Sequence, residues 1–291
     1  MLKGSYVALV TPFNNNEIDY TALENLIDLH LKNSTDGILF CGTTGESPAL
    51  AGDEKERLVR FGVKKIAGRV PVMVGTGTNN IQHTISATSK AKMWGADIAL
   101  VITPYYNKPT QNGLYHYFKK VAENTDIPLV IYNVPGRTAV NISAETTLKL
   151  AHEFSNIIGI KEASGDLVQV SKIVKDAPAG FSVMSGEDAL NLAYMSCGAQ
   201  GTVSVTANVL PQKMHDLIQL ALDGNYQDAL KIHLELLEIN NLLFIETNPI
   251  PVKHALFQMN MIKNEIRLPL YYMEEVNKQI LEDSLRKYKL I

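Results

Sequence analysis

The chain has 291 residues, of which 46% are hydrophobic and 20% charged, and its formal net charge is −3. This composition is ordinary for a globular protein and indicates neither a nucleic-acid partner nor an anionic membrane surface. No apolar stretch reaches the roughly 18 residues of a membrane-spanning helix, and the N-terminus does not read as a signal peptide. Cys41 and Cys197 form no disulfide framework, so we expect a reduced, cytoplasmic setting. The histidines are scattered, and we expect no metal site.

Short apolar runs alternate with longer amphipathic stretches over most of the chain. The predicted strands are 6–12, 37–45, 70–77, 96–104, 127–135, 157–164, 181–188 and 201–208. The predicted helices are 20–32, 53–67, 79–93, 113–124, 143–152, a stretch that begins near 166, 189–196 and 209–222. These runs make about eight strand–helix units, the number in a TIM barrel.

The predicted strands are almost continuously apolar, which is typical of parallel strands buried on both faces. With short connections they predict an α/β fold, a closed (β/α)8 TIM barrel over residues 1–224. An open doubly wound sheet is the alternative, and it is disfavoured because no G-x-G-x-x-G follows the first strand. From 225 to 291 the pattern is helical and is broken at N-P-I-P (248–251). We therefore expect a C-terminal helical domain beside the barrel.

Lys161 is the most unusual polar residue, because it follows the apolar run 157–160 inside a predicted strand. An unpaired ammonium group is costly to bury and tends to lose its proton, and a neutral amine attacks ketones. The alternative is a structural lysine paired with Glu162 or another carboxylate. Adjacent strand residues point to opposite faces, so Glu162 is a poor partner. This favours a functional lysine.

Three other features have both a functional and a plain interpretation. Tyr132 lies at a comparable height on the preceding strand, where a phenol can move protons or simply pack at the barrel rim. The turn 42–45, G-T-T-G, is either an anion-binding turn or a tight connection, and it is not a Walker A loop. Arg137 follows a Pro-Gly turn and either binds a carboxylate through two hydrogen bonds or lies in solvent.

Four motifs together resemble one family. They are G-T-T-G-E (42–46), T-P-Y-Y-N-K-P (103–109), Y-N-V-P-G-R-T (132–138) and G-I-K-E-A-S-G (159–165). The chain resembles, over essentially its whole length, the dihydrodipicolinate synthase / N-acetylneuraminate lyase superfamily of Schiff-base, pyruvate-dependent aldolases. The resemblance implies a homotetramer built from two tight dimers, with no metal or organic cofactor.

The resemblance also implies roles for four catalytic residues. Lys161 matches the lysine that forms a covalent imine with pyruvate, and Tyr132 matches the general acid/base tyrosine. Thr43 and Tyr106 match the partners of that tyrosine in a proton relay. In the family, the tyrosine at the position of Tyr106 comes from the neighbouring subunit.

Four further residues match substrate-binding positions. Thr44, with Thr43, matches the turn that holds the pyruvate carboxylate, while Val203 and Gly186 match positions at the same site. Arg137 stands where the synthases bind the carboxylate of L-aspartate 4-semialdehyde. The resemblance therefore implies condensation of pyruvate with this aldehyde, in the diaminopimelate route to lysine. The alternatives are an N-acetylneuraminate or keto-sugar-acid aldolase, or a non-catalytic barrel that senses a small molecule.

The resemblance extends to a lysine-inhibition site at the dimer interface of many family members. Three residues match this site: Ser47, Asn79 and Tyr105. Three do not match, where sensitive bacterial enzymes tend to have two histidines and a glutamate: Gly52, Lys55 and His83. Since a lysine at 55 repels a cationic effector and a histidine at 83 holds its ammonium group poorly, we expect weak or absent inhibition by lysine.

Overall fold

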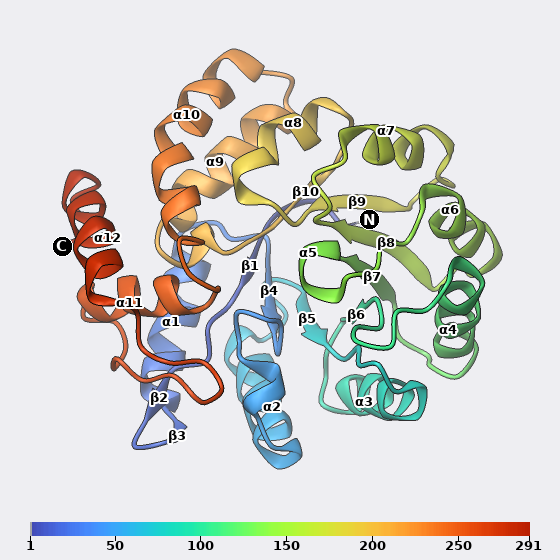
Figure 1. The fold of residues 1–291 in the computed structure, drawn as a ribbon, viewed down its shortest axis with the longest axis horizontal. Helices are drawn as coiled ribbons and strands as arrows, with labels where there is room; N and C mark the ends of the chain where they lie inside the picture. Colours follow the sequence, from blue (N-terminus) through green and yellow to red (C-terminus); the bar gives the residue numbers. More distant parts are fainter. Residues whose placement is uncertain (1) are drawn as a thin grey trace.

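The computed structural model describes residues 2–291 and contains one closed barrel of parallel strands, in the order β1-β10-β9-β8-β7-β6-β5-β4. The predicted TIM barrel is therefore confirmed (Figure 1). The barrel strands are β1 Gly4–Ala8, β4 Gly37–Phe40, β5 Val72–Gly75, β6 Ile98–Ile102, β7 Leu129–Asn133, β8 Ile157–Glu162, β9 Ser182–Ser185 and β10 Gly201–Ser204.

Helices surround the barrel on its outside, apart from the short α5 (Pro135–Thr138), which lies at the carboxyl ends of the strands (Figure 1). Those between strands are α1 Tyr20–Lys32, α2 Gly52–Ile66, α3 Ile81–Met93, α4 Gln111–Glu123, α5 Pro135–Thr138, α6 Ala144–Glu153, α7 Leu167–Asp176 and α8 Asn191–Ser196. Four follow the last strand: α9 Pro211–Leu222, α10 Tyr226–Leu242, α11 Ile250–Gln258 and α12 Glu275–Lys287. Three short 3₁₀ turns lie in the strand-to-helix loops: η1 Ser47–Ala49, η2 Asp188–Leu190 and η3 Thr206–Asn208.

The predicted strands run too far toward their carboxyl ends, and two small elements were not predicted. The first predicted strand, 6–12, is only Gly4–Ala8 in the structure, and the second ends at Phe40 because Cys41 takes a left-handed φ of 54°. A hairpin of β2 (Phe13–Asn14) and β3 (Glu17–Ile18) follows β1, and helix α5 follows β7. The hairpin turns through two asparagines with positive φ, a conformation that asparagine tolerates. Apolar loop residues thus extended the strand prediction into the loops.

Two apolar clusters hold the fold together. Alternate strand residues such as Leu39, Val130 and Met184 fill the barrel interior. The residues between them, such as Ile38, face the surrounding helices and form a larger cluster. That larger cluster includes Leu236 of α10 and residues of α12, so the C-terminal helices share apolar core with the barrel. The packed interior leaves the carboxyl ends of the strands as the place for a site.

Two further findings concern membrane-spanning helices and disulfide bonds. Between residues 2 and 291, no helix is long and apolar enough to cross a membrane. Both cysteines are free, and Cys41 is buried.

Candidate active site

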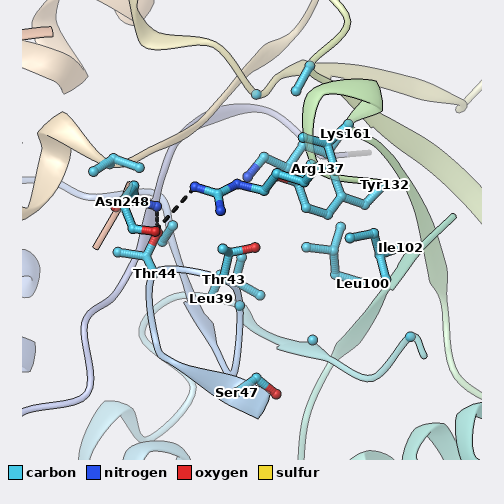
Figure 2. Close-up of a pocket in the computed structure, with 18 of the residues that line it drawn as sticks. Leu39, Thr43, Thr44, Ser47, Leu100, Ile102, Tyr132, Arg137, Lys161 and Asn248 are labelled. Carbon is cyan, nitrogen blue, oxygen red and sulfur yellow. Dashed lines mark hydrogen bonds between the residues drawn. The ribbon is translucent and has the colours of Figure 1, made fainter. Parts of the chain in front are cut away.

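A cavity of about 480 Å³ opens at the carboxyl ends of the barrel strands. Its walls come from the turn after β4, the ends of several strands and the segment that precedes α11 (Figure 2). Leu39, Leu100 and Ile102 supply apolar wall on one side. Six of the eight predicted site residues line this cavity: Thr43, Thr44, Tyr132, Arg137, Lys161 and Gly186.

Lys161 and Tyr132 lie side by side on neighbouring strands. They are direct partners in the parallel pairing of β7 with β8, and both are more than nine-tenths buried. The Lys161 Nζ lies 4.4 Å from the centroid of the Tyr132 ring. Because the same register places both side chains inside the barrel, the predicted neighbourhood of amine and phenol is confirmed.

Glu162 does not share the cavity with Lys161. Its carboxylate accepts hydrogen bonds from Asn133 Nδ2 at 3.0 Å and Gln169 Nε2 at 2.9 Å, on the side that faces α7. It also accepts one from the backbone N–H of Ser164 at 2.7 Å. Burial raises the pKa of Glu162, and these donors oppose the shift. The expectation that Glu162 is a poor partner for Lys161 is confirmed.

Gly186 leaves room for the lysine side chain. A Cβ atom at position 186 would lie 2.9 Å from Cε of Lys161 and 2.8 Å from Cβ of Ala163, too close for either neighbour. The next residue, Glu187, also lines the cavity, and the sequence did not single it out. Burial raises the pKa of its carboxyl, Asp188 raises it further, and Lys161 opposes the shift.

The turn after β4 is connected to the C-terminal part of the chain. Asn248 Nδ2 donates to Thr44 Oγ1 at 3.0 Å, and the Asn248 carbonyl accepts a hydrogen bond from Arg137 Nη2 at 3.2 Å (Figure 2). Thr44 and Asn248 are both buried, whereas Arg137 is exposed at the mouth. The sequence did not predict a role for Asn248. Its only distinctive feature was its place in the N-P-I-P motif, which indicates a break between helices and not a binding or catalytic residue.

Two predicted residues lie outside the cavity of this chain. Tyr106 is 89% exposed in the loop after β6 and has a left-handed φ of 72°. Its neighbour Tyr105 lines the cavity instead. Val203 is buried in the interior cluster of the barrel, and Val205 is the residue of that segment that lines the cavity. Over residues 2–291, no group of three or more His, Cys, Asp or Glu side chains is arranged to hold a metal ion.

A (β/α)8 barrel with a buried lysine beside a phenol at its mouth matches the fold and site expected of the barrel aldolases that the motifs resemble. Comparison with known proteins narrows this class. The family model described as "Dihydrodipicolinate synthetase family" matches residues 1–288, and the chain belongs to this family.

Individual relatives match over their full length. The chain is 50% identical over 290 residues to the 4-hydroxy-tetrahydrodipicolinate synthase of Aquifex aeolicus, covering 100% of this chain and 99% of the relative. It is 48% identical over 291 residues to the enzyme of the same name from a Hydrogenobaculum species, covering 100% of both chains. The crystal structure of dihydrodipicolinate synthase from Aquifex aeolicus superposes with a TM-score of 0.97 at 50% identity and covers 99% of each chain.

Proposed function

We propose that this chain condenses pyruvate with L-aspartate 4-semialdehyde, the 4-hydroxy-tetrahydrodipicolinate synthase reaction and the first committed step of the diaminopimelate route to lysine. Family membership and the full-length relatives of that name support the reaction. The observation in the site that carries the proposal is the buried Lys161, which lies beside a phenol and opens onto the same cavity as Arg137.

The first half of the reaction follows from the position of the Lys161 amine beside the Tyr132 phenol, which can carry protons. The Lys161 amine adds to the keto carbon of pyruvate, and the carbinolamine loses water to give an imine. Tyr132 supplies and removes the protons of these steps, and it then assists loss of a methyl proton to form the enamine. The imine withdraws the electrons that the carbon acid releases, so we infer a reaction without a metal or an organic cofactor.

The second half of the reaction uses the enamine carbon as the nucleophile. It attacks the aldehyde carbon of the semialdehyde, forming one carbon–carbon bond and regenerating the imine, while the C=O π bond opens and the aldehyde oxygen takes up a proton to become a hydroxyl group. The amino group of the semialdehyde then adds to the imine carbon, closes the ring and expels the Lys161 amine. Arg137 binds the carboxylate of this substrate. Its guanidinium lies at the mouth of the cavity and uses one N–H group to bind the Asn248 carbonyl, so its other N–H groups can donate to a carboxylate.

The turn that contains Thr43 and Thr44 binds the pyruvate carboxylate. Thr44 Oγ1 accepts a hydrogen bond from Asn248, so its hydroxyl proton remains free to donate to a carboxylate oxygen. Thr43 lines the cavity and forms the relay between Tyr132 and the third member, Tyr106. Val203 contributes the interior wall beneath this site rather than the cavity surface.

We propose that Tyr106 completes the relay of a neighbouring subunit in a tight dimer, two of which form a tetramer. Its side chain is 89% exposed and lies outside its own cavity, on a backbone with a left-handed φ that is uncommon for a residue other than glycine. In a two-fold symmetric dimer both subunits make the same contacts, so the Tyr106 of each subunit would enter the active site of the other.

The decisive experiment is borohydride reduction in the presence of pyruvate, followed by peptide mass mapping. Modification of Lys161 and its loss in Lys161→Arg would support the proposal, whereas an adduct on another lysine would refute it. Lys172→Arg, on the outer helix α7, is the matched control and should keep the adduct. Turnover with N-acetylmannosamine but not with aspartate semialdehyde would assign the alternative aldolase activity.

A further inference from the structure

Glu46 ends the G-T-T-G-E turn, two residues after Thr44, and its backbone is held tightly. Its φ is 52°, in the left-handed region, and its N–H donates to the Thr43 carbonyl at 3.0 Å. The Thr11 hydroxyl donates to the Gly45 carbonyl at 2.7 Å, on the residue before it. A small shift of Glu46 therefore moves the threonines of the turn directly.

The Glu46 carboxylate is buried and is shared between two parts of the C-terminal region. Lys253, on α11, forms an ion pair with Oε1, and the two side chains are only 3% and 1% exposed. Oε2 accepts a hydrogen bond from the backbone N–H of Arg267 at 2.9 Å. Burial lowers the pKa of Lys253, and Glu46 opposes that shift.

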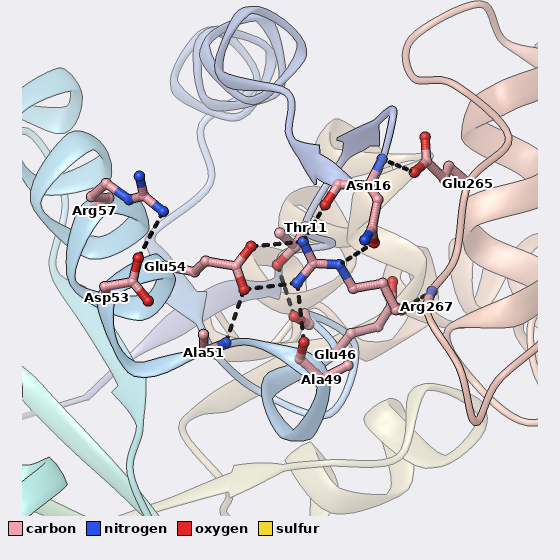
Figure 3. A network of polar contacts seen from close by, with 11 residues as sticks. Thr11, Asn16, Glu46, Ala49, Ala51, Asp53, Glu54, Arg57, Glu265 and Arg267 are labelled. Carbon is pink, nitrogen blue, oxygen red and sulfur yellow. Dashed lines mark hydrogen bonds and ion pairs between the residues drawn. The ribbon is translucent and has the colours of Figure 1, made fainter.

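Arg267 extends the connection beyond the turn to the start of α2 (Figure 3). Its guanidinium binds both carboxylate oxygens of Glu54, at 2.8 and 2.6 Å, and donates to the Ala49 carbonyl at 3.0 Å. Glu54 in turn accepts the N–H of Ala51, at the beginning of that helix. The Phe13 ring faces the cations of both Lys253 and Arg267, at 4.3 and 4.2 Å. The C-terminal region thus holds the whole segment from Glu46 to Glu54.

A buried ion pair is a costly way to gain stability. Desolvation of two charges offsets much of their attraction, and apolar replacements of the pair are often neutral or stabilising. Separating the two groups is nevertheless strongly unfavourable, because it leaves an uncompensated buried charge, so this pair holds Glu46 and Lys253 in one geometry. Here that geometry is imposed beside the turn that binds pyruvate, by the same segment that places Asn248 on Thr44.

We infer that Glu46 and Lys253 are positioning residues for pyruvate: their buried ion pair fixes the Thr43–Thr44 turn in the geometry that binds the pyruvate carboxylate. This inference rests on the proposed function of the turn. It assigns to α11 a part in substrate affinity, although Lys253 does not itself line the cavity. Neither residue touches the reacting atoms.

The test is the double variant Glu46→Gln/Lys253→Met, which removes both charges while the amide oxygen of the new side chain can still accept the Arg267 N–H. The readout is the pyruvate concentration that half-saturates borohydride trapping of Lys161. We expect this half-saturating concentration to rise about tenfold, which corresponds to the loss of one charge-assisted hydrogen bond between the turn and the pyruvate carboxylate. The kcat at saturating pyruvate should stay within about twofold. Leu281→Ala, in the buried face of α12, is the control that weakens C-terminal packing without touching the turn.

The outcomes are distinct. An unchanged half-saturating concentration, or a shift no larger than that of Leu281→Ala, would overturn the inference. Absence of trapping in the unmodified protein would instead overturn the proposed function. If the double variant does not fold, Glu54→Gln is the second variant: it loosens Arg267, the other partner of the Glu46 carboxylate, while its amide oxygen can still accept the Ala51 N–H. It should raise the half-saturating concentration about threefold. An unchanged value there would contradict the inference as well.

Discussion

Lys161 and Tyr132 are direct register partners on β8 and β7, and the lysine Nζ lies 4.4 Å from the centroid of the phenol ring. The backbone hydrogen bonds of two adjacent strands therefore set the distance between the amine and the phenol. Such strand-borne groups are held more precisely than groups on loops. The consequences of this arrangement can be tested residue by residue.

Tyr132→Phe removes the phenol hydroxyl, the proposed proton carrier, and keeps the ring beside Lys161. We expect kcat to fall about 10²- to 10⁴-fold, the usual contribution of general acid–base catalysis. Pyruvate should still be trapped on Lys161, but more slowly. The measurement is steady-state turnover together with the time course of borohydride trapping. Tyr115→Phe, which loses only a hydrogen bond to Glu153 on the outer surface, should retain normal turnover; loss of less than tenfold in Tyr132→Phe would argue against its role.

Arg137→Ala should affect the second substrate alone. Losing a charge-assisted hydrogen bond to a carboxylate is expected to lower kcat/KM for aspartate semialdehyde about 10- to 100-fold. Half-saturation of Lys161 trapping by pyruvate should be unchanged, since Arg137 is at the mouth of the cavity. Arg60→Ala, which breaks an exposed helix ion pair, is the control. A matching loss of pyruvate affinity would show that Arg137 instead supports the pyruvate turn.

The proposed exchange of Tyr106 between subunits predicts complementation. Lys161→Ala and Tyr106→Phe are each expected to be nearly inactive. In a mixed dimer, the intact Lys161 of one chain receives the intact Tyr106 of the other, so one site in two is restored. Random mixing by unfolding and refolding should therefore recover about a quarter of the wild-type activity. No recovery above the separate variants, with mixed oligomers shown by mass spectrometry, would place Tyr106 in its own subunit.

The parts of the site that could be predicted are those encoded by local pattern. Apolar strand runs identified the eight barrel strands, and the position of Lys161 and Tyr132 within those runs placed both inside the barrel. The strand ends were less predictable because loop residues such as Val134 and Val205 are as apolar as strand residues. Their side chains line the cavity instead of extending the strands.

Contacts between distant parts of the chain could not be predicted from local pattern. Asn248 is 204 residues from Thr44, and Lys253 is 207 residues from Glu46. Neither residue is unusual in its local sequence, because an asparagine before a proline and a lysine in a helix both have ordinary local explanations. Their part in the site arises only when α11 packs beside the turn after β4.

Lysine is expected to inhibit this enzyme weakly or not at all. Lys55 lies on α2 and His83 is exposed near the start of α3, so neither adds the carboxylate that an effector ammonium group requires. The measurement is the initial rate over a range of lysine concentrations at subsaturating pyruvate. His83→Glu is the informative variant and should increase sensitivity. A sub-millimolar inhibition constant for the unmodified protein would contradict the expectation.

His30 should make the protein less stable in mild acid. It is fully buried in α1, its Nδ1 lies 3.0 Å from the Thr35 hydroxyl, and burial lowers its pKa from 6.5 to about 3. Below pH 6.5 the unfolded chain binds a proton that the folded chain does not, so the free energy of unfolding falls as pH decreases, by up to about 1.4 kcal/mol per pH unit from this group. Above pH 6.5 the contribution of His30 is constant.

Urea unfolding between pH 7 and pH 4, at fixed protein concentration because of the proposed tetramer, measures this dependence. His30→Asn removes the titrating group. Its free energy of unfolding should therefore fall less steeply with decreasing pH than that of the unmodified protein, and the difference in slope corresponds to the one proton that unfolded His30 binds. His116→Asn, at an exposed position of α4, is the matched control and should leave the slope unchanged. Equal slopes in His30→Asn and the unmodified protein would mean that carboxylates, and not this buried histidine, determine the acid sensitivity.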